Sequence, residues 1–302
     1  MYQNFEAIIE AVKQQPTKKT ICIANAASDK MLHLAHKLQA QDICNMILVG
    51  DEAQIKEFAE KENVDLTKLK LIHATQTEEI ARLAVMEVSS GRADVYVKGS
   101  MNTSDFLRSV LNKEVGLRTG SKLSVLTCYE VPGQKKLFFL TDGGMVVAPD
   151  LNDKAAIVTN AVNVLHNMGI AEPKVALLSS NEKVSEKIPS TVDAQALCMM
   201  SEEGKLPAAI YEGPIAFDVA MRPDAAKEKK IESRISGDVD LFVVPNIETG
   251  NCLGKAIGYF GGGDTAGLVI GARKPVVMSS RAASIRGKLA SVAWALLACG
   301  DN

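Results

Sequence analysis

Apolar and polar residues alternate along the first hundred positions in a pattern that predicts helices and strands in turn. An opening amphipathic helix is predicted by apolar residues at the spacing of one helix face, namely Phe5, Ile8, Ile9 and Val12. Short apolar runs predict strands at residues 20–24, 46–49, 69–73 and 94–98. Periodic stretches between these runs predict helices. This alternation indicates parallel β-α units and a three-layer α/β sandwich.

The middle of the chain interrupts this pattern with a predicted β-hairpin. Two apolar runs, at residues 122–131 and 136–141, are separated by Pro132-Gly133-Gln134, a sequence typical of a turn. Alternation resumes afterwards, with predicted helices at 154–168, 191–201, 225–233 and 249–259 and predicted strands at 174–179, 208–211 and 241–244. The hairpin therefore marks a plausible crossing between two domains.

The segment 274–286 combines a strand, a polar turn and a helix. Residues 276–278 form an apolar run of the length of a buried parallel strand, and Ser279 and Ser280 are favoured residues for a helix N-cap. We expect a helix from Ala282 onward, which places Ser280 and Arg281 at the carboxyl edge of the sheet. A hydroxyl, a guanidinium and helix N–H groups there suit a phosphate-like anion. A simple cap beside a surface arginine remains the alternative.

Polar turns follow four of the predicted strands, at residues 99–104, 212–218, 245–251 and 279–281. Glycine and proline in these turns let the backbone approach a ligand, and Asn, Asp and Thr supply directed hydrogen bonds. Lys98 and Arg108 flank the first turn. Each turn alone could be a capped loop, but four of them together predict a lined cleft.

Composition and charge narrow the class of protein. Of 302 residues, 47% are hydrophobic and 23% charged, and the net charge of −2 offers no bulk field for nucleic acid or anionic membranes. The six cysteines include no C-x-x-C pair, the N-terminus lacks a signal-peptide pattern, and no apolar run reaches membrane-spanning length. We expect a cytoplasmic protein with reduced thiols and enough residues for two domains.

Nucleotide and metal motifs are weak. Residues 261–266 match G-x-G-x-x-A, but the position where an acidic residue is expected lies near Arg281, so we interpret the glycine run as a helix terminator. Residues 116–122 suggest a P-loop with the wrong spacing. The four histidines show no metal-ligand spacing, and nothing favours a Ser-His-Asp triad, although the sequence does not exclude one.

Several of these stretches together resemble the phosphate acetyltransferase and phosphate butyryltransferase family, and the resemblance covers nearly the whole chain. It rests on segments 98–108, 120–124, 213–218, 245–251 and 275–281. The chain length and the sequence of residues 279–282, which is similar to TSRA, place the chain nearer the butyryl branch. The residues that the resemblance matches to substrate-binding positions are Lys98, Asn102, Thr103, Arg108, Ser121, Lys122, Asp218, Asn246, Glu248, Thr249 and Asn251.

The resemblance implies a reversible reaction in which acyl-CoA and inorganic phosphate give acyl phosphate and CoA. It also implies two three-layer α/β/α domains with a cleft between them, similar to isocitrate and isopropylmalate dehydrogenases. We expect residues 1–132 plus 272–302 in one domain and 133–271 in the other. A homodimer or higher homo-oligomer is implied, with CoA as substrate, no cofactor and no metal.

The resemblance also assigns catalytic residues. Ser280 matches a serine thought to stabilise the tetrahedral oxyanion, and Arg281 matches an arginine that holds the phosphate. Arg108 and Lys122 fall at or near basic positions of the acetyl branch, where Lys122 would replace an arginine.

One position departs from the acetyl branch. Where that branch has an aspartate that serves as base for the CoA thiol, this chain has Gly287, flanked by Arg286 and Lys288. Our hypothesis is that Arg281, Arg286 and Lys288 together stabilise the thiolate, with Asp218 or Glu248 as the fallback base.

Two other functions stay open from the sequence. An NAD-dependent dehydrogenase on the similar fold would need a cluster of aspartates for its metal, which the strand-end turns do not show. A non-catalytic protein that binds acyl-CoA or acyl phosphate is distinguished from an enzyme only by turnover.

Overall fold

The computed structural model describes residues 2–279 and 283–299. Its contacts divide the chain into two compact units, each built from separate stretches of sequence. Unit 1 comprises Met1–Gln3 and Lys122–Thr265, and unit 2 comprises Asn4–Ser121 and Ala266–Asn302. The chain therefore changes unit at 121/122 and 265/266, whereas the predicted domains change at 132/133 and 271/272. The hairpin strand after residue 122 belongs to unit 1 because it pairs with its hairpin partner there.

The sheet of unit 2 has the strand order β3-β2-β1-β4-β11-β10. Its strands are β1 (Thr20–Ala24), β2 (Asn45–Gly50), β3 (Lys70–His73), β4 (Val95–Lys98), β10 (Asp264–Ile270) and β11 (Val276–Val277). All neighbours are parallel except β10, which runs antiparallel to β11. Because β1, β4 and β11 are parallel neighbours, their carboxyl ends lie at one edge of the sheet.

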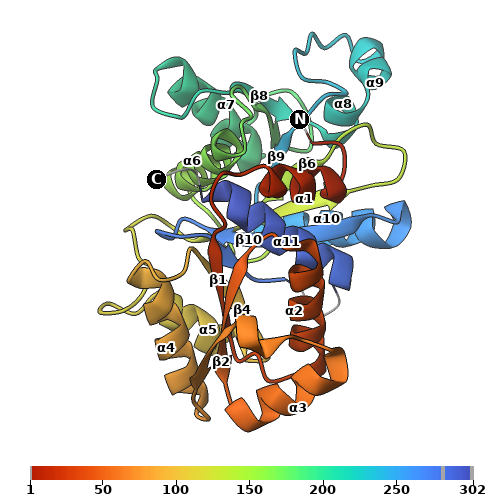
Figure 1. Ribbon diagram of the computed structural model, residues 1–302. Coiled ribbons are helices and arrows are strands. Elements are labelled where there is room, and N and C mark those ends of the chain that lie inside the picture. The colour runs from red at the N-terminus through yellow and green to blue at the C-terminus, as the bar shows by residue number, and fades with distance from the viewer. Residues whose placement is uncertain (1, 280–282, 300–302) are drawn as a thin grey trace. The chain divides into compact units, whose positions relative to one another are not determined.

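Helices cover both faces of this sheet. They are α1 (Phe5–Lys13), α2 (Asp29–Gln41), α3 (Glu52–Glu62), α4 (Thr77–Ser89), α5 (Thr103–Val110) and α11 (Ile285–Ala298), with a short 3-10 turn at Leu66–Lys68. Helices α4 and α5 pack together on one face, and α11 packs between α1 and α2 on the other (Figure 1). Nearly every residue of α11 is buried, including Trp294, so this helix fills the core.

The strands of unit 1 follow the order β5-β6-β9-β7-β8. Its strands are β5 (Ser124–Glu130), β6 (Phe138–Thr141), β7 (Lys174–Leu178), β8 (Ile210–Ile215) and β9 (Leu241–Val243). The antiparallel pairing of β5 with β6 confirms the predicted hairpin, and the remaining pairs are parallel. Its helices are α6 (Leu151–Asn167), α7 (Pro189–Glu202), α8 (Phe217–Met221), α9 (Pro223–Glu228) and α10 (Ile247–Gly261).

The elements agree with the expected α/β class, with several local differences. The helix predicted at 225–233 is α9, which ends at Glu228, and the polar turn predicted at 212–218 is occupied by the end of β8 and the start of α8. Gly262 ends α10 in the left-handed conformation at φ 64°, which confirms the glycine run as a helix terminator. The helix predicted from Ala282 instead begins at Ile285, because Ser284 is its N-cap and accepts a hydrogen bond from the Gly287 N–H. Strand β10 was not predicted.

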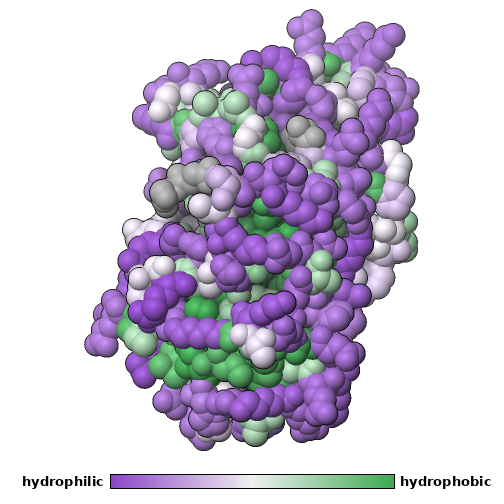
Figure 2. Space-filling model, in the orientation of Figure 1, coloured by the Kyte–Doolittle hydropathy of each residue, from purple (hydrophilic) through white to green (hydrophobic). Residues whose placement is uncertain are grey.

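The visible surface is mainly hydrophilic, as the composition leads us to expect. Figure 2 shows hydrophilic residues over most of one face of the molecule, with hydrophobic residues between them, chiefly in the part that draws unit 2. No helix among the described residues is long and apolar enough to span a membrane.

Candidate functional site

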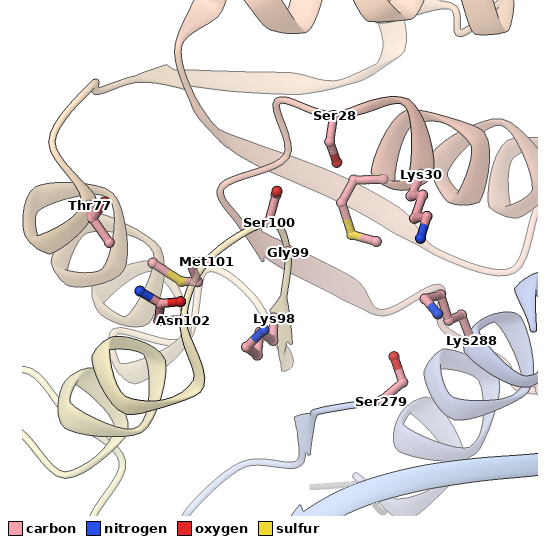
Figure 3. A pocket seen from close by; sticks show the side chains of 11 residues that line it. Ser28, Lys30, Thr77, Lys98, Gly99, Ser100, Met101, Asn102, Ser279 and Lys288 are labelled. Atoms are coloured by element: carbon pink, nitrogen blue, oxygen red, sulfur yellow. The ribbon is translucent and has the colours of Figure 1, made fainter. Parts of the chain in front are cut away.

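A cavity of about 440 Å³ opens at the carboxyl edge of the unit 2 sheet. Figure 3 shows its lining side chains, which come from the ends of β4 and β11 and from the starts of α2, α4 and α11. The lining residues are Ser28, Lys30, Met31, Thr77, Lys98, Gly99, Ser100, Met101, Asn102, Ser279 and Lys288. Its volume falls in the range of small-molecule sites, which is about 300–1,000 Å³.

The turn that supplies Gly99 and Ser100 to the lining of the cavity is in close contact with the turn after β1. After β4, the Gly99 N–H donates to the Ala24 carbonyl at 2.9 Å, and the Asn25 side-chain amide donates to the Ser100 carbonyl at 2.6 Å. A Cβ atom on Gly99 would lie 2.3 Å from the Asn25 carbonyl oxygen. Glycine is therefore required where the chain passes from β4 into the turn.

Three helices begin at the cavity without a side-chain cap. The N-cap residues of α2, α4 and α5, which are Ser28, Gln76 and Asn102, make no side-chain cap hydrogen bond. In the described part of unit 2 the remaining α-helices, α1, α3 and α11, are capped by Asn4, Asp51 and Ser284. The first N–H groups of a helix attract anions. The capping pattern therefore leaves the positive ends of α2, α4 and α5 directed towards the cavity.

Positive charge surrounds the same space. Lys30, Lys98 and Lys288 line the cavity, and none of its described lining residues is an Asp or Glu. Lys288 is only 7% exposed, and its Nζ donates to the Ala283 carbonyl at 2.6 Å. The site is thus suited to an anionic ligand.

Arg286, the neighbour of Lys288 in our hypothesis of thiol activation, has a different environment. It forms a bidentate pair with Glu6, with Nε and Nη2 at 2.9 and 2.6 Å from the two carboxylate oxygens, and its guanidinium lies 5.1 Å from the Phe5 ring centroid. The hydrogen bonds from Arg286 lower the pKa of Glu6. Because Glu6 balances its charge, Arg286 contributes little to a cationic field, and Lys288 is the cation of this pair that reaches the cavity.

The predicted residues of unit 2 divide into two groups. Lys98 and Asn102 line the cavity, and Thr103 is the exposed first residue of α5. Arg108 lies instead in a separate cavity of about 260 Å³, paired with Asp105 at 2.9 Å. Ser121 is exposed, and its N–H donates to the Thr119 hydroxyl.

Two charged residues predicted to bind substrate in unit 1 are engaged in ion pairs. Lys122 lies 2.8 Å from Asp153, and the hydrogen bond to Asp153 raises the pKa of Lys122. Asp218, in α8, lies 2.9 Å from Lys229, whose hydrogen bond lowers the pKa of Asp218. A carboxylate with a lowered pKa is a weaker base. Asp218 is therefore poorly suited to the fallback role that we considered.

The remaining predicted residues of unit 1 cluster at the start of α10. Asn246 is the N-cap, and its side-chain oxygen accepts from the N–H and the hydroxyl of Thr249. Glu248 is exposed, and the Asn251 amide donates to the Gly143 carbonyl at 3.3 Å. The two residues predicted to be catalytic, Ser280 and Arg281, lie outside the described residues. Ser279, which precedes them in the chain, lines the unit 2 cavity.

Comparison with known proteins adds an independent result. The family model described as "Phosphate acetyl/butaryl transferase" matches residues 4–83 and 73–296. The phosphate butyryltransferase of Clostridium acetobutylicum is 38% identical over 302 residues, which cover 100% of both chains. The phosphate acetyltransferase of Rhizobium meliloti is 37% identical, with 97% of this chain and 93% of the relative covered.

The chain belongs to this family. A solved structure agrees with the assignment: that of a branched-chain phosphotransacylase from Enterococcus faecalis superposes with a TM-score of 0.81 at 30% identity, covering 93% of this chain and 99% of that one. The resemblance seen in the sequence is confirmed. The roles of individual residues stay predictions.

The sequence left several residues of the cavity unassigned, namely Ser28, Lys30, Met31, Thr77, Ser100 and Met101. Ser28 follows β1 in the same way that the four predicted polar turns follow their strands. The end of the strand predicted at residues 20–24 could therefore have identified Ser28 as a candidate site residue. Lys30 and Thr77 occupy first turns of helices, where polar residues are ordinary. No group of three or more His, Cys, Asp or Glu among the described residues is placed to hold a metal ion.

Proposed function

We propose that the protein is a phosphate acyltransferase that interconverts acyl-CoA plus inorganic phosphate with acyl phosphate plus CoA, with butyryl or another short-chain acyl group. The observation that supports this most is the cavity of unit 2. It combines three lysines, three serine hydroxyls and three helix N-termini, and its lining includes Ser279, which precedes Ser280 and Arg281 in the chain. Family membership supplies the reaction class.

The chemistry accounts for these residue types. A phosphate oxygen attacks the thioester carbonyl, the carbonyl oxygen becomes a tetrahedral oxyanion, and the C–S bond then breaks to release the CoA thiolate. Oxyanions are stabilised by preorganised hydrogen-bond donors and cations. We assign this stabilisation to Ser280 and the binding of phosphate to Arg281, on the basis of the family positions that they match.

The leaving thiolate needs stabilisation more than it needs a base. A free thiol has a pKa near 8.5, so a moderate cationic field is enough to favour its anion near neutral pH. Lys288 supplies such a field at the cavity, where no carboxylate is found among the described lining residues. In the reverse direction the same field would favour ionisation of the CoA thiol.

The proposal includes the architecture implied by the family resemblance. Two three-layer α/β/α domains would face each other across a cleft, as in isocitrate and isopropylmalate dehydrogenases, in a cytoplasmic homodimer or larger homo-oligomer. The parallel β-α units of each described unit are consistent with this arrangement. We propose that CoA serves as substrate and that no metal or bound cofactor takes part.

Phosphate-dependent release of CoA is the direct test. Purified protein is mixed with acetyl-, propionyl-, butyryl- and hexanoyl-CoA, with and without phosphate, and CoA is followed with a thiol reagent. We expect release only with phosphate, fastest for a short acyl chain, and unaffected by a chelator. Release that is equally fast without phosphate would indicate a thioesterase. No release with any acyl-CoA would favour a binding protein, and reduction of NAD would favour the dehydrogenase.

A further inference from the structure

The cavity of unit 2 contains two lysines that the sequence did not assign to substrate binding. Lys30 is an exposed residue in the first turn of α2, and Lys288 is a buried residue in the first turn of α11. In Figure 3 they border the same opening as Lys98 and Ser279. Three separate elements therefore bring an ammonium group to one space.

The environments of these lysines argue for a ligand. Lys288 is only 7% exposed although it lines the cavity, and its Nζ donates to the Ala283 carbonyl at 2.6 Å. Lys30 makes no ion pair with any residue in 2–279 or 283–299. The described lining of the cavity contains three lysines and no Asp or Glu, so the electrostatic field in this space favours an anion.

The chemistry of the cavity selects phosphate among anions. Lysine binds phosphate as a point charge, and helix N-termini add backbone donors to the same oxygens. Ser28 and Ser100 contribute hydroxyls, and α2 and α5 begin here without side-chain caps. A phosphate group could come from the phosphoryl substrate or from CoA itself.

The position of Ser279 in the chain indicates which of these two molecules supplies the phosphate group. Ser279 lines the cavity and directly precedes in the chain Ser280 and Arg281, the residues that we assign to the oxyanion and the reacting phosphate. The phosphates of CoA are separated from its thiol by the whole pantetheine arm. The location therefore favours the phosphoryl substrate.

We propose that Lys30 and Lys288, together with Lys98, bind the phosphate group of inorganic phosphate and acyl phosphate in this cavity. This inference rests on the proposed function, and it adds two binding residues to those that the family resemblance supplies. Lys288 has a second effect, because its bond to the Ala283 carbonyl fixes the chain just after the Ser280–Arg281 segment.

The test compares charge-removing variants with a matched control. Lys30→Met and Lys288→Met keep an unbranched side chain without the ammonium group, and Lys288→Arg keeps the charge. Lys37→Met is the control, because Lys37 is an exposed lysine on the same helix as Lys30 and does not line the cavity. Each protein is assayed for the KM of phosphate and of butyryl-CoA, and for binding of inorganic phosphate by calorimetry.

We expect each lysine-to-methionine change in the cavity to raise the phosphate KM and the calorimetric Kd about tenfold or more, the effect of losing a charged hydrogen bond. The KM of butyryl-CoA should change by less than about twofold, Lys37→Met should match the wild type, and Lys288→Arg should recover part of the phosphate affinity. Because Lys30 is exposed, its variant tests the proposal even if Lys288→Met fails to fold.

Other outcomes would overturn the inference. A raised KM for butyryl-CoA with an unchanged phosphate KM would assign the cavity to the phosphates of CoA. Unchanged constants in Lys30→Met would remove the cavity from substrate binding. If the wild type binds phosphate through these lysines but releases no CoA, the proposed function fails while the phosphate site stands.

Discussion

Two turns, one in each unit, follow parallel strands and lead to an asparagine at a helix N-cap. The two asparagines differ in whether the side chain makes the cap hydrogen bond. The turn after β4 in unit 2 leads to Asn102 as the N-cap of α5, and the turn after β9 in unit 1 leads to Asn246 as the N-cap of α10. The Asn246 side-chain oxygen accepts from the Thr249 N–H at 2.9 Å and from the Thr249 hydroxyl at 2.7 Å. Asn102 makes no such cap bond and lines the cationic cavity.

The difference shows how one sequence signature serves two purposes. An asparagine after a strand favours an N-cap in both units. In unit 1 the cap bond satisfies donors at the helix end, so that asparagine stabilises the helix. In unit 2 the corresponding donors of α5 are not covered by the cap side chain, and they lie beside three lysines. We infer that the helix in unit 2 keeps its positive end for a ligand.

Adding a methyl group to Gly99 in the turn after β4, or to Gly250 in the first turn of α10, should have the largest effect. A Cβ on Gly99 would lie 2.3 Å from the Asn25 carbonyl oxygen, and a Cβ on Gly250 would lie 2.6 Å from the Gly143 Cα atom. We expect Gly99→Ala and Gly250→Ala each to lower the free energy of unfolding by about 1–3 kcal/mol or more. Thermal unfolding would measure this, at roughly 2–4 °C per kcal/mol.

The phosphate KM of the same two variants should distinguish the unit 2 turn from the unit 1 helix start. Gly99→Ala should also raise the phosphate KM, because it displaces the turn that carries Lys98 and Asn102, whereas Gly250→Ala should leave that constant unchanged. Gly267→Ala is the control, since its Cβ would meet the Met278 carbonyl oxygen at an ordinary 3.5 Å. A stable Gly99→Ala protein with normal kinetics would show that the turn is not held as described.

We expect a pH dependence of folding stability that comes from the loop packed against α10 in unit 1. The loop that packs against Gly250 begins at Asp142, which is 3% exposed and accepts from the N–H groups of Gly144, Met145 and Val146. Burial raises the pKa of Asp142 in spite of these hydrogen bonds. The native state therefore holds this proton more tightly than the unfolded state, and stability is lost as pH rises from about 4 through the native pKa.

Asp142→Asn removes this ionisation and isolates the effect. Urea unfolding of both proteins from pH 4.5 to 8 should show the advantage of the wild type over Asp142→Asn shrinking as pH rises and levelling off above the native pKa. An advantage that grows with pH would mean that the three backbone donors outweigh burial and hold the pKa below its usual value.

Local patterns in the sequence predicted most elements of both units. The Pro132-Gly133-Gln134 turn predicted the hairpin, and the apolar face that includes Phe5 and Ile8 predicted α1. Strand β10 was missed because Asp264–Ile270 follows a glycine run directly and becomes a strand through its pairing with β11, which is a tertiary contact. The start of α11 was misplaced because Ser280 and Ser284 are equally good cap residues, and local sequence does not choose between them.

The site was predictable only where its residues follow strands. Lys98 and Asn102 stand directly after an apolar run, so their position at a sheet edge followed from the pattern. Lys30 and Lys288 lie on helices, where a lysine ordinarily indicates a solvated face. Their approach to Lys98 depends on β1, β4 and β11 being neighbours, and strand order is not encoded in local periodicity.

The paired variants Asn102→Ala and Asn246→Ala test the central claim most directly, with unfolding stability and phosphate KM measured on both. We predict that Asn246→Ala loses about 1 kcal/mol of stability, the usual cost of a lost cap, and keeps the phosphate KM of the wild type. Asn102→Ala should unfold like the wild type and show a phosphate KM raised several-fold. Equal losses of stability with unchanged kinetics in both variants would contradict the claim that the α5 end is kept for the phosphate.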